Sequence, residues 1–369
     1  MNESLAFHLL NSLPGCGAKT IRFVVGIFGS AEAAWLAPES AWTNLGQPRL
    51  STIALARLNI DPGKERVLLD ESGIWVIPFT DPTFPKLLTE IPDAPALLYV
   101  RGTYRTCNSD HLIAIVGSRK FTNYGKQVTE ELARALVQAG YTIVSGLAFG
   151  IDAIAHEATL EANGKTLAIL GSGIDDASLS PQTHLNLAHD ILEKGALISE
   201  LGPGTNASTG TFPARNRIMA GLSQGVIVVE AAEESGSLIT ARLALDYNRE
   251  VFAVPGSIFS PTSSGTHALL KEGAKLVTGI HDILAELGDT FATQETVSEV
   301  SEILQTLSSE EATVYKSLTH EGIHVDKLIA AARLEAMQVS TILTKLELRG
   351  LAKNIGNMHY TRGRSSSIS

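Results

Sequence analysis

Short apolar runs recur through the middle of the chain, and helix-like patterns separate most of them. The runs are rich in Ile, Val and Leu and lack polar alternation, as expected for strands that are buried on both faces. We predict strands at Leu112–Val116, Thr142–Ser145, Thr166–Leu170, Ala196–Glu200, Val226–Glu230, Glu250–Val254 and Ala274–Val277. We predict helices at Lys126–Ala139, Ile151–Ala162, Leu185–Lys194, Pro213–Leu222, Leu238–Tyr247 and Thr266–Glu272. Repeated strand–helix–strand units imply right-handed crossovers. We therefore expect an α/β fold built on an extended Rossmann-like, doubly wound, mostly parallel sheet.

The two flanks of this region follow different patterns. Residues 1–75 have helical periodicity with a Pro-Gly break, which predicts an N-terminal helical domain of the SAM or helix-hairpin-helix type. Near the C-terminus, a Ser308-x-x-Glu311 capping box, further helical patterns and a Gly356-Asn357 turn predict a winged-helix-like domain. The predicted boundaries are 1–75 for the helical domain, 76–285 for the Rossmann-like domain, 286–300 for a polar linker, 301–362 for the winged-helix-like domain and 363–369 for a disordered tail.

Charge and composition limit the classes of function. The chain of 369 residues has 29 Lys and Arg against 39 Asp and Glu, a formal charge of −10, so any nucleic-acid site must be local. With only two cysteines and no Cys/His cluster, we expect neither a metal site nor a disulfide framework. The sequence has no Walker A or GxGxxG motif, and we expect no cofactor. It has no basic leader and no apolar run of membrane-spanning length, so we expect a cytoplasmic protein without a membrane partner.

Glycine follows many of the predicted strands, for example Gly117, Gly146, Gly171 and Gly173. The carboxyl ends of strands in an open α/β sheet border the ligand crevice. Glycine there lets backbone amides approach a phosphate, especially at helix N-termini. A simpler explanation is that short strand-to-helix turns need glycine. The number of glycines at one edge favours a phosphate-bearing ligand.

The densest group of polar and aromatic residues is Phe212-Pro213-Ala214-Arg215-Asn216-Arg217. Proline suits the first helical position, which would put both arginines in the first turn, where cations oppose the helix dipole. An anionic partner would explain them, with Phe212 stacking on a base while arginine contacts phosphate. The alternative is that one arginine forms an internal salt bridge with Glu200 or Glu230.

The turn Gly117-Ser118-Arg119 offers a second set of phosphate ligands: a hydroxyl, a guanidinium and the amides of a helix start. The alternative is that Ser118 caps the helix and Arg119 is solvated. Phe149, at the next turn, would either stack on a base or pack into the sheet.

Four acidic residues near these turns suggest other chemistry. Asp152 and His156 lie one helical turn apart and suit metal binding or acid–base work, but we favour dipole stabilisation and a hydrogen-bonded histidine. Asp175 and Asp176 would bind sugar hydroxyls, repel anions or shape their loop, and the sequence does not decide. Glu230 would suit a hydrolase, but the sequence offers it no partner base or metal.

Taken together, these residues resemble the DprA/Smf family, the DNA-processing protein A of bacterial transformation. The matching motifs include IVGSR, VSGLAFGIDAIAH, FPARNRIMAGLS, SGSLIT and REVFAVPG, and the resemblance covers all of 75–280. It implies a non-enzymatic protein that binds single-stranded DNA, forms a homodimer and loads the recombinase RecA onto the strand during DNA uptake. It departs from the family where Thr209 and Thr211 stand near a position that is often basic, and at Ser180, where tyrosine is common.

The resemblance and the turn positions together give the expected strand-binding residues. They are Gly117, Ser118, Arg119, Gly146, Phe149, Gly171, Gly173, Phe212, Arg215, Asn216 and Arg217. One alternative is a nucleotide phosphohydrolase of the lysine-decarboxylase-like superfamily, although its PGGxGTxxE signature is absent. Another is a scaffold that senses a mononucleotide in the same crevice.

The flanking domains offer few cations for DNA. The Leu13-Pro14-Gly15-Cys16-Gly17 hairpin has only Lys19 and Arg22 nearby, and the helix expected at 338–349 has only Lys345 and Arg349. Phosphate contacts need local positive charge. We therefore expect the first to be mainly a fold element and the second to favour protein contact over DNA reading.

Overall fold

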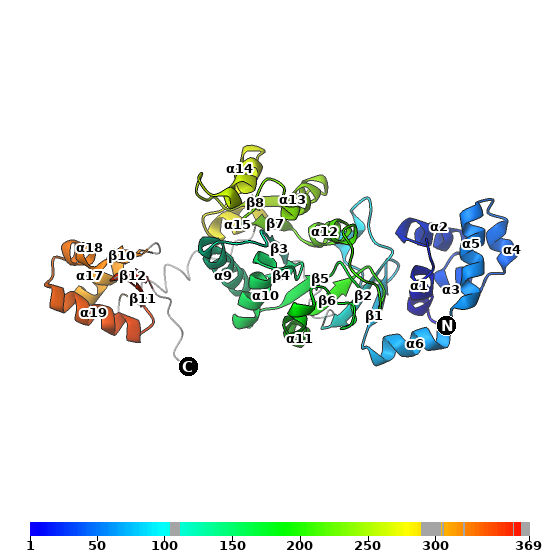
Figure 1. Ribbon diagram of the computed structural model, residues 1–369, viewed down its shortest axis with the longest axis horizontal. Coiled ribbons are helices and arrows are strands. Elements are labelled where there is room, and N and C mark those ends of the chain that lie inside the picture. Colours follow the sequence, from blue (N-terminus) through cyan, green and yellow to red (C-terminus); the bar gives the residue numbers. More distant parts are fainter. Residues whose placement is uncertain (104–110, 289–303, 305, 320–321, 357, 363–369) are drawn as a thin grey trace. The chain divides into compact units, whose positions relative to one another are not determined.

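The computed structural model describes residues 1–103, 111–288, 304, 306–319, 322–356 and 358–362, and forms two compact units, Met1–Thr290 and Phe291–Ser369 (Figure 1). The predicted tail at 363–369 and most of the predicted linker lie outside the described residues. The finer domain boundaries stay predictions. No helix in the described ranges is long and apolar enough to cross a membrane.

The first unit is built on a sheet in which nine strands of the described residues pair in the order β1-β2-β6-β5-β4-β3-β7-β8-β9. Their bounds are β1 Trp75–Pro78, β2 Leu97–Gly102, β3 Leu112–Val116, β4 Thr142–Ser145, β5 Thr166–Ile169, β6 Ala196–Ser199, β7 Gly225–Val228, β8 Glu250–Ala253 and β9 Lys275–Leu276. Strands β3 to β9 pair in parallel, and β1 and β2 add an antiparallel edge. The mostly parallel sheet and its seven predicted strands are confirmed.

Helices cover both faces of this sheet, as a doubly wound fold requires (Figure 1). One face carries α9 Asn123–Gln138, α10 Ile151–Glu161, α11 Leu185–Lys194 and α15 Ile280–Leu287, and the other carries α12 Thr211–Leu222, α13 Gly236–Asp246 and α14 Ser264–Lys271. Alternate residues of β3 enter the two cores: Ile113 and Ile115 on the first face, Ala114 and Val116 on the second. Short helices α7 Lys86–Thr89, η2 Gln182–His184 and η3 Pro261–Ser263 lie in the connections.

The order of the strands reverses beside β3. The chain runs outward from β3 through β4 and β5 to β6, and then returns to β7 on the other side of β3. The helices that follow β3 and β7 lie on opposite faces of the sheet. The loops at the carboxyl ends of these two strands therefore diverge, and such a switch point is where open α/β sheets bind ligands.

The N-terminal helices share a core with this sheet. They are α1 Glu3–Asn11, α2 Ala18–Phe28, α3 Ala31–Leu36, α4 Glu39–Thr43, α5 Pro48–Ala56 with η1 Arg57–Asn59, and α6 Pro62–Glu71. Phe7 and Leu10 of α1 pack in one cluster with Leu97 and Tyr99 of β2. The buried His8 ring lies between the Tyr99 hydroxyl and the Glu65 carboxylate, 2.8 Å from each.

The second unit is a winged-helix domain with its own core. Helices α17 Ser309–Ser317, α18 Val325–Ala332 and α19 Ala336–Leu348 accompany a sheet of β10 Ile323–His324, β12 His359–Arg362 and β11 Ala352–Gly356. The predicted capping box is present, because Ser308 Oγ accepts from the Glu311 amide at 3.2 Å and Glu311 Oε2 accepts from the Ser308 amide at 3.0 Å. Lys345 and Arg349 each lie 3.9 Å from Glu311, which partly neutralises the cations of α19.

Candidate single-stranded DNA groove

A groove of about 650 Å³ opens at the switch point, beside the carboxyl ends of β3 and β7. Its walls come from the turn after β3, the start of α10, the first half of α12 and the start of α13. The polar and aromatic lining residues include Ser118, Arg119, Lys120, Asp152, Phe212, Arg215, Asn216, Glu234, Ser235, Ser237 and Thr240. Six of the predicted residues line this groove: Gly117, Ser118, Arg119, Phe212, Arg215 and Asn216.

One cation of the turn after β3 faces an aromatic ring. Arg119 and Lys120 are exposed, and the guanidinium carbon of Arg119 lies 5.7 Å from the centre of the half-buried Phe212 ring. A cation at this distance is attracted to the ring face. The groove thus combines a flat apolar surface with exposed positive charge, which is the pairing that single-stranded nucleic acid needs.

Ser118 does not cap helix α9, so the alternative that we gave for this residue is wrong. Helix α9 begins at Asn123, and its cap is Thr122, whose hydroxyl accepts from the Gly125 amide at 3.2 Å. The Ser118 hydroxyl instead hydrogen-bonds within its own turn, to the backbone of Lys120. We expected the amides of a helix start beside Ser118. That expectation is wrong, because the turn extends past Phe121 and α9 begins only at Asn123.

Helix α12 begins at Thr211, two residues earlier than predicted, so Pro213 is its third residue and Arg215 is beyond the first turn. The dipole argument for an anionic partner is accordingly weaker. Arg215 is buried and its Nη1 donates to the carbonyls of Gly146 and Ile169, at the ends of β4 and β5. Asn216 Nδ2 donates to Gly236 O at 3.3 Å and so joins α12 to the start of α13.

Asp152 and His156 take structural roles. Asp152 is buried, accepts from the Gly146 amide at 3.2 Å and offsets the charge of nearby Arg215. Burial lowers the pKa of Arg215 to about 10, which leaves it charged at neutral pH. Burial likewise lowers the pKa of His156 to about 3, and its Nδ1 lies 2.7 Å from the Thr166 hydroxyl. Among the described residues, no three His, Cys, Asp or Glu side chains are grouped as a metal site requires.

Arg217 does not line the groove. It forms the internal salt bridge that was our alternative, pairing with Glu200, and its Nε lies 3.6 Å from Asp93. Its side chain is only 12% exposed. A strand-binding role for Arg217 therefore has no geometric support, because its cation is already neutralised from two sides.

The glycines beside the groove are mostly explained by the protein itself. A Cβ at Gly117 would lie 2.7 Å from the Ile151 side chain, at Gly146 2.5 Å from Arg215, and at Gly171 2.9 Å from the Phe212 ring. A Cβ at Gly173 would lie 2.8 Å from a backbone oxygen. These positions thus need glycine for packing between turns rather than for the approach of a ligand.

Gly146, Phe149, Gly171 and Gly173 also lie outside the lining of the groove. Phe149 is half-exposed and contacts His184 edge-on, with the ring centres 4.9 Å apart. Its turn nevertheless adjoins the groove, because the backbones of Ser118 and Arg119 pack directly against the neighbouring Gly150. A Cβ at Gly150 would lie 2.8 Å from the Arg119 Cα. Phe149 does not pack into the sheet.

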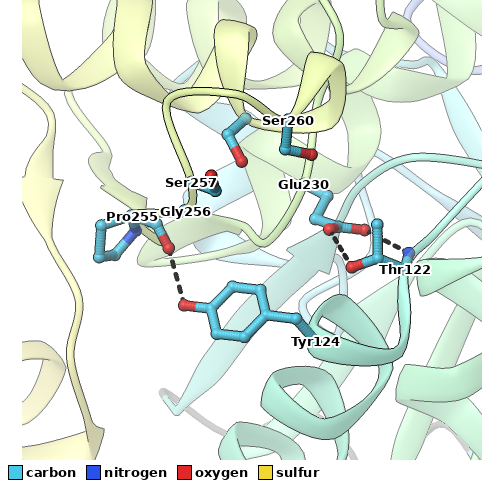
Figure 2. Close-up of a pocket in the computed structure, with 8 residues that line it drawn as sticks. Thr122, Tyr124, Glu230, Pro255, Gly256, Ser257 and Ser260 are labelled. Atoms are coloured by element: carbon cyan, nitrogen blue, oxygen red, sulfur yellow. Dashed lines mark hydrogen bonds between the residues drawn. The ribbon is translucent and has the colours of Figure 1, made fainter.

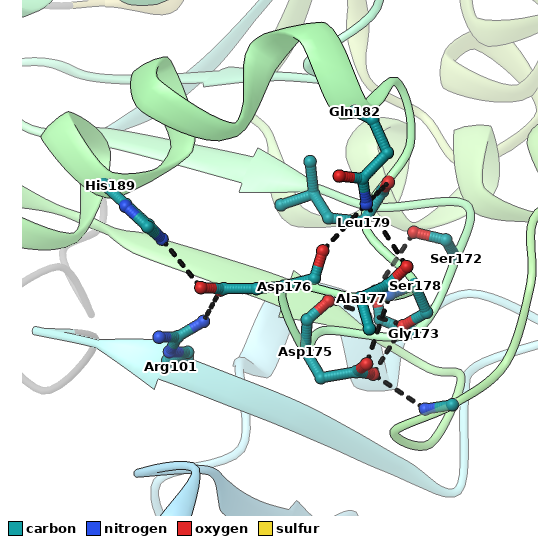
Figure 3. A network of polar contacts seen from close by, with 11 residues as sticks. Arg101, Ser172, Gly173, Asp175, Asp176, Ala177, Ser178, Leu179, Gln182 and His189 are labelled. Atoms are coloured by element: carbon teal, nitrogen blue, oxygen red, sulfur yellow. Dashed lines mark hydrogen bonds and ion pairs between the residues drawn. The ribbon is translucent and has the colours of Figure 1, made fainter.

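The loop at 171–181 is held by hydrogen bonds within it and by polar contacts to neighbouring segments (Figure 3). The Asp175 carboxylate accepts from the amides of Ser178 at 3.1 Å and Gly204 at 2.7 Å. Asp176 pairs with Arg101 and lies 3.0 Å from His189. Burial favours the neutral acid, but the partners Arg101 and His189 outweigh it and lower the pKa of Asp176. Both carboxylates therefore shape the loop.

Glu230 borders a second cavity, of about 420 Å³, between α9 and the loop after β8 (Figure 2). Its Oε2 accepts from the Thr122 amide at 2.9 Å, and its Oε1 accepts from the hydroxyls of Thr122 at 2.6 Å and Thr262 at 3.1 Å. Tyr124 closes one side by donating to Pro255 O at 2.7 Å. Glu230 thus anchors the cap of α9, and in the part of the chain that the structure describes it belongs to no group of three His, Cys, Asp or Glu side chains that could hold a metal.

The N-terminal hairpin has little free charge. Arg22 Nη2 donates to Pro95 O at 2.9 Å, and its guanidinium carbon lies 4.0 Å from the centre of the Phe79 ring. Only Lys19, of the two cations we named there, is exposed without such a role. This supports the interpretation of the hairpin as a fold element.

Sequence reasoning missed several lining residues. Lys120 directly follows the GSR motif and could have been included for its charge alone. The start of α13, with Gly236 and Thr240, was considered only as part of the family motif SGSLIT, and neither residue was named as a candidate.

Comparisons with known proteins identify the family to which the sheet domain and the winged-helix domain belong. The family model described as DNA recombination-mediator protein A matches residues 75–288, and a model of the DprA winged helix domain matches residues 299–355. The chain is 43% identical to DNA processing protein DprA of Bacillus subtilis over 217 residues, 59% of this chain and 72% of that one. It is 33% identical to protein Smf of Synechocystis across 98% of this chain and 99% of the other.

Two solved structures are similar in fold. An X-ray structure of DprA from Streptococcus pneumoniae superposes with a TM-score of 0.68 at 34% identity, over 78% of this chain and 98% of that one. A structure of DNA processing protein A from Helicobacter pylori, which addresses its single-stranded DNA binding mode, gives a TM-score of 0.52 at 33% identity over 57% of this chain and 94% of that one. Because the first family model matches residues 75–288 and the Synechocystis relative is similar across nearly the whole chain, this chain belongs to the DprA/Smf family of DNA-processing and recombination-mediator proteins.

Proposed function

We propose that the chain binds single-stranded DNA in the groove at the switch point, without catalysing a reaction. The observation that carries this proposal is the exposed Arg119 guanidinium over the Phe212 ring. An unpaired base would stack against Phe212 while Arg119 and Lys120 contact the phosphates on either side. The similar H. pylori protein, studied for its single-stranded DNA binding mode, supports this assignment.

Arg215, Asn216, Gly117, Gly146 and Gly171 have supporting roles in this proposal. Arg215 and Asn216 fix α12 so that Phe212 faces the turn after β3, and the three glycines let the turns pack behind it. A phosphohydrolase would need a free carboxylate with a base or metal beside it. The two candidates, Glu230 and Asp152, are both engaged in hydrogen bonds that organise the fold.

The test is fluorescence anisotropy of labelled oligo-dT over a salt series, with unlabelled duplex and dTMP as competitors. Among the described residues that line the groove, the exposed cations are Arg119 and Lys120. We therefore expect a plot of the logarithm of the binding constant against the logarithm of the salt concentration to have a slope of about −1.4. Duplex should compete poorly because its bases are stacked inside the helix. The proposal would be contradicted if duplex competed as well as unlabelled oligo-dT, or if dTMP displaced the labelled strand at a concentration equal to that of the oligonucleotide.

We further propose that the bound strand is protected and passed to RecA in the cytoplasm during DNA uptake, and that the protein acts as a homodimer. Motif resemblance to the family supports both. RecA ATPase activity on oligonucleotide coated with a single-strand-binding protein should rise when this protein is added. Sedimentation should give twice the mass of the chain. Unchanged ATPase activity would contradict loading, and a monomer at micromolar concentration would contradict the dimer.

A further inference from the structure

The start of α13 forms one end of the groove and, unlike the turn after β3 and helix α12, contributes no cationic side chain to its lining. Ser235, Gly236 and Ser237 all line the groove there, and the helix has 11 residues. Ser235 caps it, but its hydroxyl lies 3.4 Å from the Ser237 amide, a long distance for a hydrogen bond. The Leu238 amide already donates to Ser235 O at 3.0 Å, so the amides that lack a good partner are those of Gly236 and Ser237, and together with the helix dipole they favour an anion.

Thr240, one turn further along α13, supplies a second and independent observation. It lines the groove, is 1% exposed, and its hydroxyl has no hydrogen-bond partner in the part of the chain that the structure describes. A helical threonine commonly donates to the carbonyl one turn upstream, but here that carbonyl, Gly236 O, accepts from Asn216. A buried hydroxyl without a partner costs stability, so a ligand that accepts its proton would explain its presence.

Gly236 gives a third observation. Unlike Gly117, Gly146 and Gly171, it has no atom within 4 Å of the position that a Cβ would occupy. Its backbone conformation is not one that requires glycine. Nothing in the described protein therefore excludes a side chain at Gly236, whereas a ligand that lies against the first amides of α13 would.

We propose that the start of α13, with the Thr240 hydroxyl, holds one internucleotide phosphate of the bound strand. This inference rests on the proposed single-stranded DNA binding and adds a phosphate site in which no cationic side chain takes part. Glu234 also lines this end of the groove, and its negative charge opposes a doubly charged terminal phosphate more than a singly charged phosphodiester. The site should therefore take an internal linkage of a strand rather than the phosphate of a free nucleotide.

The variants that test this site separate binding from folding. Thr240→Val keeps the shape and removes the hydroxyl, and should weaken oligo-dT binding about tenfold while leaving the melting temperature unchanged or higher. Thr240→Ser keeps a hydroxyl and should bind within about twofold of the wild type. Gly236→Ala adds a methyl group in open space and should also weaken binding about tenfold.

Methylphosphonate substitution identifies the linkage. A series of oligo-dT molecules, each with one neutral linkage, should show one position at which the wild type loses affinity but Thr240→Val and Gly236→Ala lose nothing further. Thr240→Val binding like the wild type, or no position showing this coupling, would overturn the inference. Displacement of the oligonucleotide by dTMP or inorganic phosphate in the wild type but not in Thr240→Val would overturn the preference for an internal linkage. Failure of the wild type to bind oligo-dT would instead refute the proposed function itself.

Discussion

The guanidinium carbon of Arg119 lies 5.7 Å from the centre of the Phe212 ring, although one residue follows β3 and the other lies in the first turn of α12. The contact joins the two turns that border the switch point. Behind it, Gly171 makes room for the ring and Arg215 fixes the helix to the ends of β4 and β5. The geometry of the groove therefore depends on buried residues, and its affinity for a strand on exposed ones.

Arg119→Ala should weaken oligo-dT binding by about 1–3 kcal/mol, because it removes a charge-assisted contact to phosphate. Arg119→Lys should recover only part of this loss, since lysine keeps the charge but lacks the planar fork. Anisotropy titrations at fixed salt measure both. The melting temperature should not change, because Arg119 is exposed. Wild-type affinity in a folded Arg119→Ala protein would remove this residue from the site.

Phe212→Ala should weaken binding by about 1–3 kcal/mol through loss of one stacked base. Phe212→Leu is the matched control, since it keeps apolar bulk beside Gly171 but has no flat ring. Titration with an oligonucleotide that carries a single abasic position in each place in turn should identify the stacked base. If the leucine variant binds as well as the wild type, then Phe212 acts by packing and not by stacking.

Arg217→Ala should behave differently from Arg119→Ala. Its removal leaves Glu200 and Asp93 without their cation, and Glu200 is only 20% exposed. We expect a loss of about 1–3 kcal/mol in the free energy of unfolding, measured by urea denaturation, and little change in strand affinity of the folded protein. A selective loss of DNA binding at unchanged stability would return Arg217 to the strand-binding set.

Glu230→Gln should destabilise the fold without altering strand binding. The carboxylate accepts from the Thr122 amide and from two hydroxyls (Figure 2), and a glutamine would present an NH₂ group to at least one of these donors. We expect a loss of about 1–3 kcal/mol in the free energy of unfolding. If the variant keeps full stability but loses affinity for a nucleotide or a strand, the second cavity has a ligand after all.

Acid should destabilise the protein through His156 once the pH falls below about 6.5. Burial lowers the folded-state pKa of His156 from 6.5 to about 3, with Arg215 and His184 acting in the same direction. Between these values the unfolded chain binds a proton that the folded chain does not. The stability contributed by neutral His156 is therefore complete above pH 6.5 and is lost as the pH falls toward 3, by up to about 1.4 kcal/mol per pH unit.

The comparison variant for this pH effect is His156→Asn, whose side-chain amide can still donate to the Thr166 hydroxyl. That hydroxyl donates to Ile143 O at 2.9 Å, so it accepts from His156 Nδ1. Urea denaturation at pH 7.5, 6.5 and 5.5 should show a steeper loss of stability in the wild type than in the variant. Burial also lowers the pKa of His8, despite the opposing effect of Glu65, and this contribution is present in both proteins. Parallel stability curves would contradict the assignment.

The sequence by itself determined the seven parallel strands, the winged helix and the edge of the sheet at which the groove lies. Continuous apolar runs such as Leu112–Val116 specify strands buried on both faces, and strand–helix alternation specifies their parallel arrangement. The Ser308–Glu311 capping box is equally local, because both of its hydrogen bonds join residues three apart. The carboxyl edge follows from the direction of the strands, so the order of strands and motifs along the chain is enough to place IVGSR and FPARNRI at one edge.

Only the tertiary structure decided which residues at that edge are free to bind a ligand. Arg119 and Arg217 are both arginines in motifs at this edge, and the sequence gives no reason to treat them differently. In the structure, Glu200 and Asp93 neutralise Arg217 but not Arg119, and both partners lie outside the segment that contains Arg217. Gly146 and Gly236 both follow strands, yet a Cβ would meet Arg215 at Gly146 and open space at Gly236. Periodicity and spacing specify elements through local hydrogen bonding and burial. The partner of a charge and the space beside an atom depend on segments that folding brings together.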